Sequence, residues 1–359
     1  MESGRKQISL FHYFSRIHAI ALLSWFPALI SGCTAILLPE RNEDIGIGTG
    51  SSINKEDTCT QSFIISRSID YETVESLDIF IFEDDAQGRL DSYQQNTIDP
   101  KGDYRVAVAS TKGKKRIVMI ANSHKDRKHW AGIRTYEGLA REKVSLYEED
   151  ISFPTMYGET VFSAEDGVER TITLRPLVSE IHLGSIRCDF SGREYEGEKL
   201  KDVKVYLTNV NAECRIMQEH GFDVGTTVNT GHLNHMELEK FRHPELIYRP
   251  LGTDVGYEIF DTGIRLYSYP NESADETPGS PFTMLVIEGT IRGKTWYYPI
   301  AINRDAGNTG IGRNCSYTYN ITILRTGSTD PGAAVSAETV LINSQILSWD
   351  ERNEEEIAF

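Results

Sequence analysis

The sequence predicts a mostly β protein made of antiparallel β-sandwiches. Three observations support this prediction: many short segments alternate apolar and polar residues, turn-forming residues separate them, and no strand–helix–strand rhythm recurs. The chain has 359 residues, 39% of them hydrophobic and 25% charged, which is typical of a globular protein. This length is enough for two domains of ordinary size in tandem.

The first half of the chain contains several segments that alternate as strands do. They lie at residues 62–66, 77–82, 104–109, 115–122, 171–174 and 179–186. The third and fourth of them flank a Lys-Gly-Lys turn around Gly113, so the sequence predicts that they form a hairpin. Arg175 and Pro176 interrupt the last two, which indicates a domain boundary near residues 176–190.

The second half continues the same β pattern. Its strand-like segments lie at residues 203–207, 283–288, 295–302, 317–323 and 339–343. Two short stretches, 136–148 and 234–243, have helical spacing instead. The sequence therefore predicts strands throughout, with little helix.

A leader precedes these segments. Arg5, Lys6 and Arg16 are followed by the short apolar run 17–26 and then by small residues, as in a secretory signal peptide. The apolar run is too short to span a membrane, which takes about 20 apolar residues. Cys33 follows the small residues, and this arrangement resembles the bacterial lipobox. We therefore expect a lipoprotein signal peptide at 1–32 and an acylated Cys33; an ordinary signal peptide with an incidental cysteine is the alternative.

The net charge excludes some classes of partner, and the spacing of the cysteines excludes some kinds of metal and redox site. A net charge of −16 argues against nucleic acid and against an anionic membrane face, since both select clustered Lys and Arg. Four further cysteines are too widely spaced for zinc or redox motifs of the CxxC type. One disulfide and buried free thiols both stay open for Cys59, Cys188, Cys214 and Cys315.

Four features occur along the chain in a fixed order. They are Cys33 with a polar Gly/Ser-rich tether; a strand ending at Arg67 before Asp70, Glu72 and Glu75; the run 174–181; and a tail from Asn314-Cys315-Ser316-Tyr317 through 327–331 to a strand ending at Trp349. In this order they resemble the FimA-type fimbrillins, the subunits of type V pili of Bacteroidales bacteria.

The resemblance implies two transthyretin-like β-sandwich domains, which we expect at residues 68–180 and 181–359. It implies a lipid-anchored precursor at the outer membrane and an Arg-specific extracellular protease that cuts after Arg67. Residues 33–67 would be removed and Ser68 would become the N-terminus; Arg41 is the rival site. Losing the first strand opens an apolar groove and an unpaired edge, which a strand from another fimbrial subunit fills.

The donor strand is expected within residues 333–359. Alternation places Val340, Ile342 and Ile346 on one face and Leu341, Leu347 and Trp349 on the other. Two apolar faces suit a strand inserted into a groove. The alternative is an ordinary last strand of the chain's own C-terminal domain.

The resemblance implies a stalk subunit of a fimbrium at the cell surface, because the chain has both an Arg at the expected site and a C-terminal extension. A fimbrial anchor or tip subunit stays open. So does a non-polymerising glycan-binding surface lipoprotein, whose platform would be Tyr267, Tyr269, Trp296, Tyr297 and Tyr298.

No catalytic residues, metal site or cofactor are predicted. His232, His235 and His243 lie near Glu237 but lack the spacing of a zinc motif. The glycines at 46–50 and 310–312 lack the strand–glycine–helix context of a phosphate loop.

Overall fold

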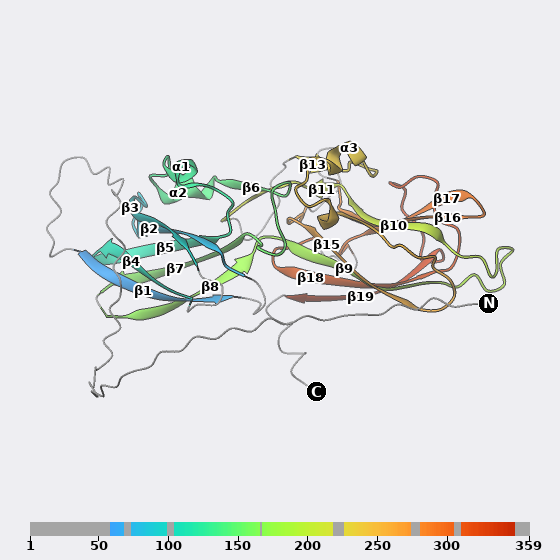
Figure 1. The fold of residues 1–359 in the computed structure, drawn as a ribbon, viewed down its shortest axis with the longest axis horizontal. Coiled ribbons are helices and arrows are strands. Elements are labelled where there is room, and N and C mark those ends of the chain that lie inside the picture. Colours follow the sequence, from blue (N-terminus) through green and yellow to red (C-terminus); the bar gives the residue numbers. More distant parts are fainter. Residues whose placement is uncertain are drawn as a thin grey trace, which may run out of the picture. The chain divides into compact units, whose positions relative to one another are not determined.

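The structure is a computed structural model that describes residues 58–67, 73–98, 104–165, 167–217, 226–273, 281–304 and 310–348. The predicted signal peptide, Cys33, Arg41, Ser68 and Trp349 lie outside these residues. Within them the chain is mostly β, as the sequence predicts, and Figure 1 shows its strands gathered in several sheets. None of the helices in the described part is long and apolar enough to cross a bilayer.

The first half of the chain forms one seven-stranded sheet with the order β3-β2-β5-β7-β8-β1-β4. Its strands are β1 (Thr58–Arg67), β2 (Ser76–Glu83), β3 (Leu90–Thr97), β4 (Arg105–Thr111), β5 (Gly113–Ala121), β7 (Met156–Ala164) and β8 (Glu169–Pro176). Among the described residues, β7 pairs with β8 only at Met156 and Tyr157, and the two parts of the sheet then separate around a shared apolar core. This part of the chain is therefore a sandwich rather than a flat sheet.

The second half forms two four-stranded sheets. One has the order β14-β10-β16-β17 and the other the order β15-β9-β18-β19. Their strands are β9 (Ser179–Cys188), β10 (Lys201–Thr208), β14 (Tyr248–Pro250), β15 (Phe260–Ser268), β16 (Met284–Ile291), β17 (Lys294–Ala301), β18 (Cys315–Ile323) and β19 (Val340–Ser348). Their alternating residues contribute to a common apolar cluster.

Short elements connect these sheets. They are α1 (Arg127–Trp130), α2 (Tyr136–Ala140), β6 (Lys143–Ser145), β11 (Val210–Asn211), β12 (Glu213–Arg215), β13 (Thr227–Val228), α3 (His235–Leu238) and the 3₁₀ turn Pro244–Leu246. The chain leaves the seven-stranded sheet at Pro176 and enters the next sheet at Ser179. β6 pairs with β12 across this crossover, and one apolar cluster contains residues from both sides of it.

The hairpin expected around Gly113 is wrong. β4 pairs with β1 and β5 pairs with β2 and β7, so the Lys-Gly-Lys turn carries the chain between the two separated parts of the sheet. The turn chemistry was correct, but the partner of each strand is decided by which core face it buries. Likewise β6 replaces the second half of the helix expected over 136–148, because its backbone pairs with β12.

The structure also shows whether the four cysteines that follow Cys33 form a disulfide. Cys59, Cys188, Cys214 and Cys315 are free thiols, three of them buried. Burial raises the pKa of the Cys188 thiol to about 12 and also raises that of Cys214. Of the two alternatives left open by the sequence, the structure has the free thiols.

Candidate functional site

The first strand, β1, lies inside the seven-stranded sheet, between β4 and β8 (Figure 1). It pairs antiparallel with β4, where Phe63 faces Val106, and parallel with β8, where Ile65 faces Ile172. A segment at the beginning of the described chain thus supplies two ladders of the sheet, one to β4 and one to β8. Its removal would leave two unpaired strand edges facing each other.

The inner face of β1 is part of the core. Phe63 is fully buried and meets Phe162 edge-on, with ring centroids 5.4 Å apart. Ile65 and Cys59 are buried on the same face. Val106, Val108, Ile172 and Leu174 from the neighbouring strands complete the apolar surroundings. Without β1, these side chains would line an open apolar groove.

One polar residue, Gln61, interrupts the apolar face of β1. Its side-chain amide donates to the Glu165 carbonyl at 3.2 Å and to the Cys59 sulfur at 3.0 Å. Arg170 on β8 donates to the Gln61 carbonyl oxygen at 2.9 Å. The buried amide is therefore satisfied.

Arg67 is the last residue of β1 and is half-buried. Its guanidinium lies over the Tyr104 ring, 4.4 Å from the centroid, and donates to the Tyr104 hydroxyl at 3.3 Å. The following residues, from Ser68, lie outside the described part. The predicted processing site therefore lies at the end of the strand whose removal would open the groove.

The predicted donor strand corresponds to β19, an edge strand that pairs with β18. Ile342 and Ile346 are opposite Ile321 and Tyr317, so they share the inner face with the buried Val340. Leu341 and Leu347 point to the other face, as the alternation predicts. Leu341 is 54% exposed, and Ile342 and Ile346 are each 43% exposed. An edge strand with exposed apolar residues on both faces favours pairing with another chain.

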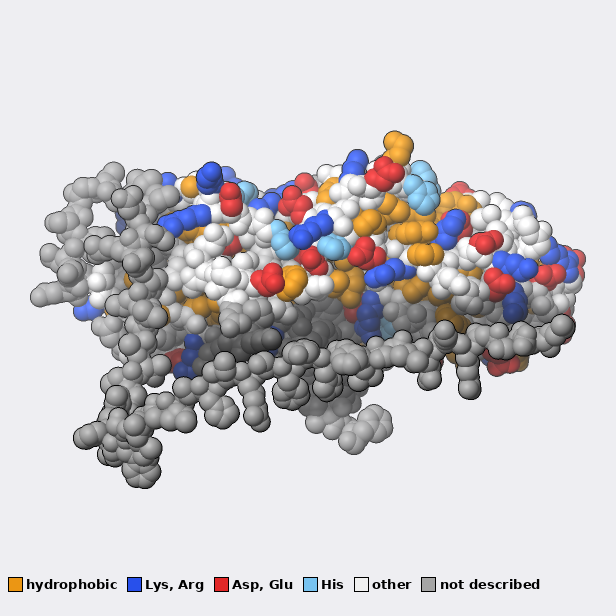
Figure 2. Space-filling view, in the orientation of Figure 1, with side chains coloured by type: hydrophobic (Ala, Val, Ile, Leu, Met, Phe, Trp, Pro, Cys, Tyr) orange, Lys and Arg blue, Asp and Glu red, His pale blue; other side chains and the backbone are white. Residues whose placement is uncertain are grey.

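The aromatic residues considered as a glycan platform do not form one surface. Tyr267 is on β15 and Tyr269 follows it, whereas Trp296, Tyr297 and Tyr298 are on β17 of the other sheet. Tyr269 and Tyr298 are fully buried. Figure 2 shows acidic and basic side chains intermixed over the visible face, with apolar side chains gathered beside α3.

Histidines and acidic residues do not gather into a metal site in the described part. No group of three or more His, Cys, Asp or Glu there has a suitable arrangement. His243 instead lies 3.0 Å from a Glu245 carboxylate oxygen and 3.4 Å from one of Asp150.

Lys115 and Glu149 are among the buried charged groups that sequence reasoning missed. Lys115 occupies an inward position of β5, on the face shared by Ile117 and Met119, and it contacts Glu83 and Asp91. A lysine at an inward position of an alternating strand was the available signal. Glu149 gave no such signal, because it lies between β6 and β7 where no periodicity exists.

Glu149 connects the two halves of the chain. Its carboxylate accepts hydrogen bonds from the Thr155 backbone N–H and from the Tyr269 hydroxyl, each at 2.6 Å. Complete burial outweighs these bonds and raises the pKa of Glu149 to about 7. We therefore expect the charge of Glu149 to change near neutral pH.

Comparison with solved structures shows which proteins share this architecture. The FimA fimbrilin of Porphyromonas gingivalis superposes with a TM-score of 0.58 at 14% identity, covering 81% of this chain and 97% of the other. A candidate cell adhesion protein of Bacteroides eggerthii gives 0.60 at 15% identity, with 82% and 96% covered. The fold is that of a fimbrillin.

A C-terminally truncated form of the tip fimbrial protein Mfa3 of Porphyromonas gingivalis has the same fold, with a TM-score of 0.51 at 13% identity, covering 81% of this chain and 100% of the truncated one. No family model and no curated protein matches the sequence. These comparisons confirm the fimbrillin-type β fold that the resemblance predicts. At such low identities they establish the fold and leave the function to be argued from the residues.

Proposed function

We propose that this chain is a structural fimbrial subunit that polymerises by protease-triggered strand exchange and supports adhesion and colonisation. The observation that carries the proposal is the place of β1: an early strand, ending in an Arg, buries Phe63 and Ile65 between β8 and the edge strand β4. Fully burying a side chain of this kind is worth roughly 1.5–3 kcal/mol. Releasing β1 therefore creates a site with a strong preference for a replacement strand.

In this proposal an Arg-specific extracellular protease cuts after Arg67 and Ser68 becomes the N-terminus. Residues 33–67 leave, and the groove between β4 and β8 accepts the 333–359 segment of another fimbrial subunit. The donor's Val340, Ile342 and Ile346, or its Leu341, Leu347 and Trp349, replace the apolar side chains of β1. Residues 68–180 form the accepting domain and residues 181–359 the donating one.

The proposal also includes the location of the precursor and that of the assembled fimbrium. Acylation of Cys33 anchors the precursor to the outer membrane, and the assembled fimbrium extends from the cell surface. The exposed apolar faces of β19 and the fold shared with fimbrial proteins support this function. A stalk subunit fits both features, since it must accept one strand and donate another.

Replacing Arg67 with Ala tests the proposal. The variant keeps the apolar face of β1, so we expect a folded precursor that stays uncut and forms no ladders on SDS gels run without boiling. Arg41→Ala serves as the matched control and should be processed and assembled normally. Normal ladders from Arg67→Ala, or their loss in Arg41→Ala alone, would show that the processing site has been misassigned.

A further inference from the structure

β4 depends on the strand that the proposed function removes. It lies at the edge of the seven-stranded sheet, and within the described residues its ladder partner is β1. When β1 leaves, β4 loses that entire ladder while its Val106 and Val108 must still form one wall of the groove. An edge strand without other attachments would fray and close the acceptor site. Contacts that do not involve β1 must therefore hold β4 in place.

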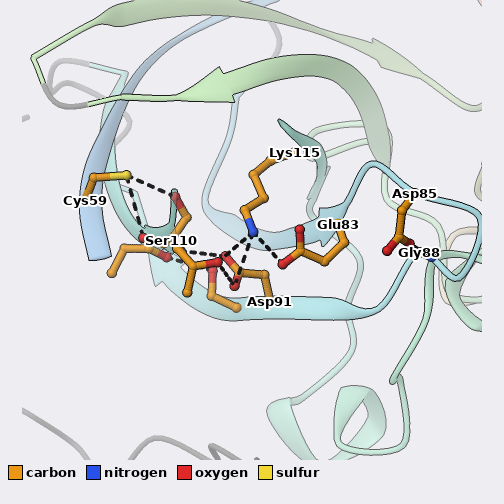
Figure 3. A network of polar contacts seen from close by, with 10 residues as sticks. Cys59, Glu83, Asp85, Gly88, Asp91, Ser110 and Lys115 are labelled. Carbon is orange, nitrogen blue, oxygen red and sulfur yellow. Dashed lines mark hydrogen bonds and ion pairs between the residues drawn. The ribbon is translucent and has the colours of Figure 1, made fainter. Parts of the chain in front are cut away.

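Such contacts converge at the end of β4 that is nearest to β5. The Lys115 side chain is only 1% exposed, and its ammonium group donates to Glu83 at 2.5 Å and to the Thr111 hydroxyl at 2.6 Å. The ammonium group lies 3.6 Å from an Asp91 oxygen. Figure 3 shows Lys115, Glu83 and Asp91 pointing toward one another from β5, β2 and β3.

Asp91 makes the direct connection to β4. Its carboxylate accepts the Thr111 backbone N–H at 2.9 Å and the Thr111 hydroxyl at 2.7 Å. One residue along β3, the Ser92 hydroxyl donates to the Ala109 carbonyl at 2.8 Å. These bonds join β4 to strands that stay in place when β1 departs.

The backbone of β1 pairs with this end of β4, where Thr58 is opposite Thr111, but a β1 side chain adds little to the network of polar side chains. The Cys59 sulfur lies 3.7 Å from the Ser110 carbonyl and 3.8 Å from its hydroxyl, which are weak contacts (Figure 3). The Lys115 and Asp91 side chains, by contrast, are only 1% and 6% exposed, so removing Asp91 leaves a buried ammonium group that the 33% exposed Glu83 compensates only in part. The side-chain contacts that hold this cluster together therefore come mainly from strands other than β1.

We propose that Glu83, Asp91, Thr111 and Lys115, here called the β4 clamp, hold β4 as a fixed wall of the groove after β1 has been released. This inference rests on the proposed strand exchange and names the residues that keep the acceptor site open. The clamp residues are positioning residues, because they act on the incoming strand through β4 rather than by touching it.

The test compares the full chain before and after it is cut with an Arg-specific protease. Thr111→Val removes the hydroxyl bonds to Asp91 and Lys115 but keeps the backbone bond to Asp91, while Asp91→Ala removes both bonds between Asp91 and Thr111 and keeps the one from Lys115. Two quantities are measured: hydrogen exchange of residues 105–111, and binding of a fluorescent synthetic peptide with the β1 sequence of residues 58–67. Lys204→Met, which breaks the 2.6 Å contact with Glu288 on a distant sheet, is the matched control.

We expect the uncut variants to protect β4 nearly as well as the unmodified chain, because β1 is still paired. After cutting, both clamp variants should exchange at 105–111 at least tenfold faster and bind the peptide at least tenfold more weakly, with Lys204→Met unchanged. Equal binding and equal protection in cut clamp variants would overturn the clamp. Equal losses before and after cutting would also overturn it, since they indicate general destabilisation. Failure of the cut unmodified chain to bind the peptide would contradict the proposed function instead.

Discussion

Phe63→Ala should destabilise the precursor but leave the assembled fimbrium unaffected. Phe63 is fully buried in β1 and packs edge-on against Phe162, so truncation leaves a cavity that the rigid strands around it fill poorly. Buried Phe-to-Ala changes cost about 3–5 kcal/mol. At roughly 2–4 °C per kcal/mol for a domain of 150–250 residues, the precursor's melting transition should fall by about 6–20 °C.

The same substitution should have no effect after processing, because residues 33–67 have then left the subunit. The assay measures thermal unfolding of the full-length precursor and the temperature at which SDS-resistant ladders of the processed protein disappear. Phe162→Ala is the matched control, since Phe162 lies on β7 and lines the groove in both states. It should weaken both. If Phe63→Ala weakened the ladders as much as Phe162→Ala does, β1 would still be present in the polymer, which contradicts its release after processing.

Three further predictions follow from the same arrangement. Cys33→Ala should abolish acylation, and equal labelling with palmitate in both proteins would contradict the lipoprotein assignment. Deleting residues 333–359 should leave a folded monomer that accepts a strand but cannot donate one; unfolding instead would make this segment a core strand of its own domain. Burial raises the pKa of Glu149 from 4.5 to about 7, so its contribution to stability is complete below pH 4.5 and is lost as the pH rises to about 7. That loss is about 3 kcal/mol, and Glu149→Gln should flatten it in unfolding measurements at pH 4.5 and 8, whereas an unchanged slope would exclude Glu149 as its source.

Local alternation predicted the strands well where one face of a strand is apolar. The segments 77–82, 115–122 and 317–323 lie within β2, β5 and β18 or overlap them almost completely. β3 was missed because its sequence is largely polar and its side chains are only partly covered. The ends of β7 and β15 contain both apolar and polar residues. These segments are identified as strands by their pairing with β5 and β9.

Pairing over long distances could not be predicted from the pattern. The parallel register of β1 with β8 joins residues more than 100 positions apart, and nothing local to either strand specifies it. The same holds for Lys115 and Asp91, whose proximity depends on the sheet order. By contrast, the two faces of β19 followed directly from its sequence, because the side-chain period of a strand is 2.

Strand exchange at Arg67 can be checked by determining the N-terminal sequence of subunits taken from assembled fimbriae on cells. We expect a chain that begins at Ser68, with residues 33–67 absent and β1 therefore replaced. Subunits that begin at acylated Cys33, or at Asn42 after a cut at Arg41, would retain β1 and would contradict strand exchange at this site.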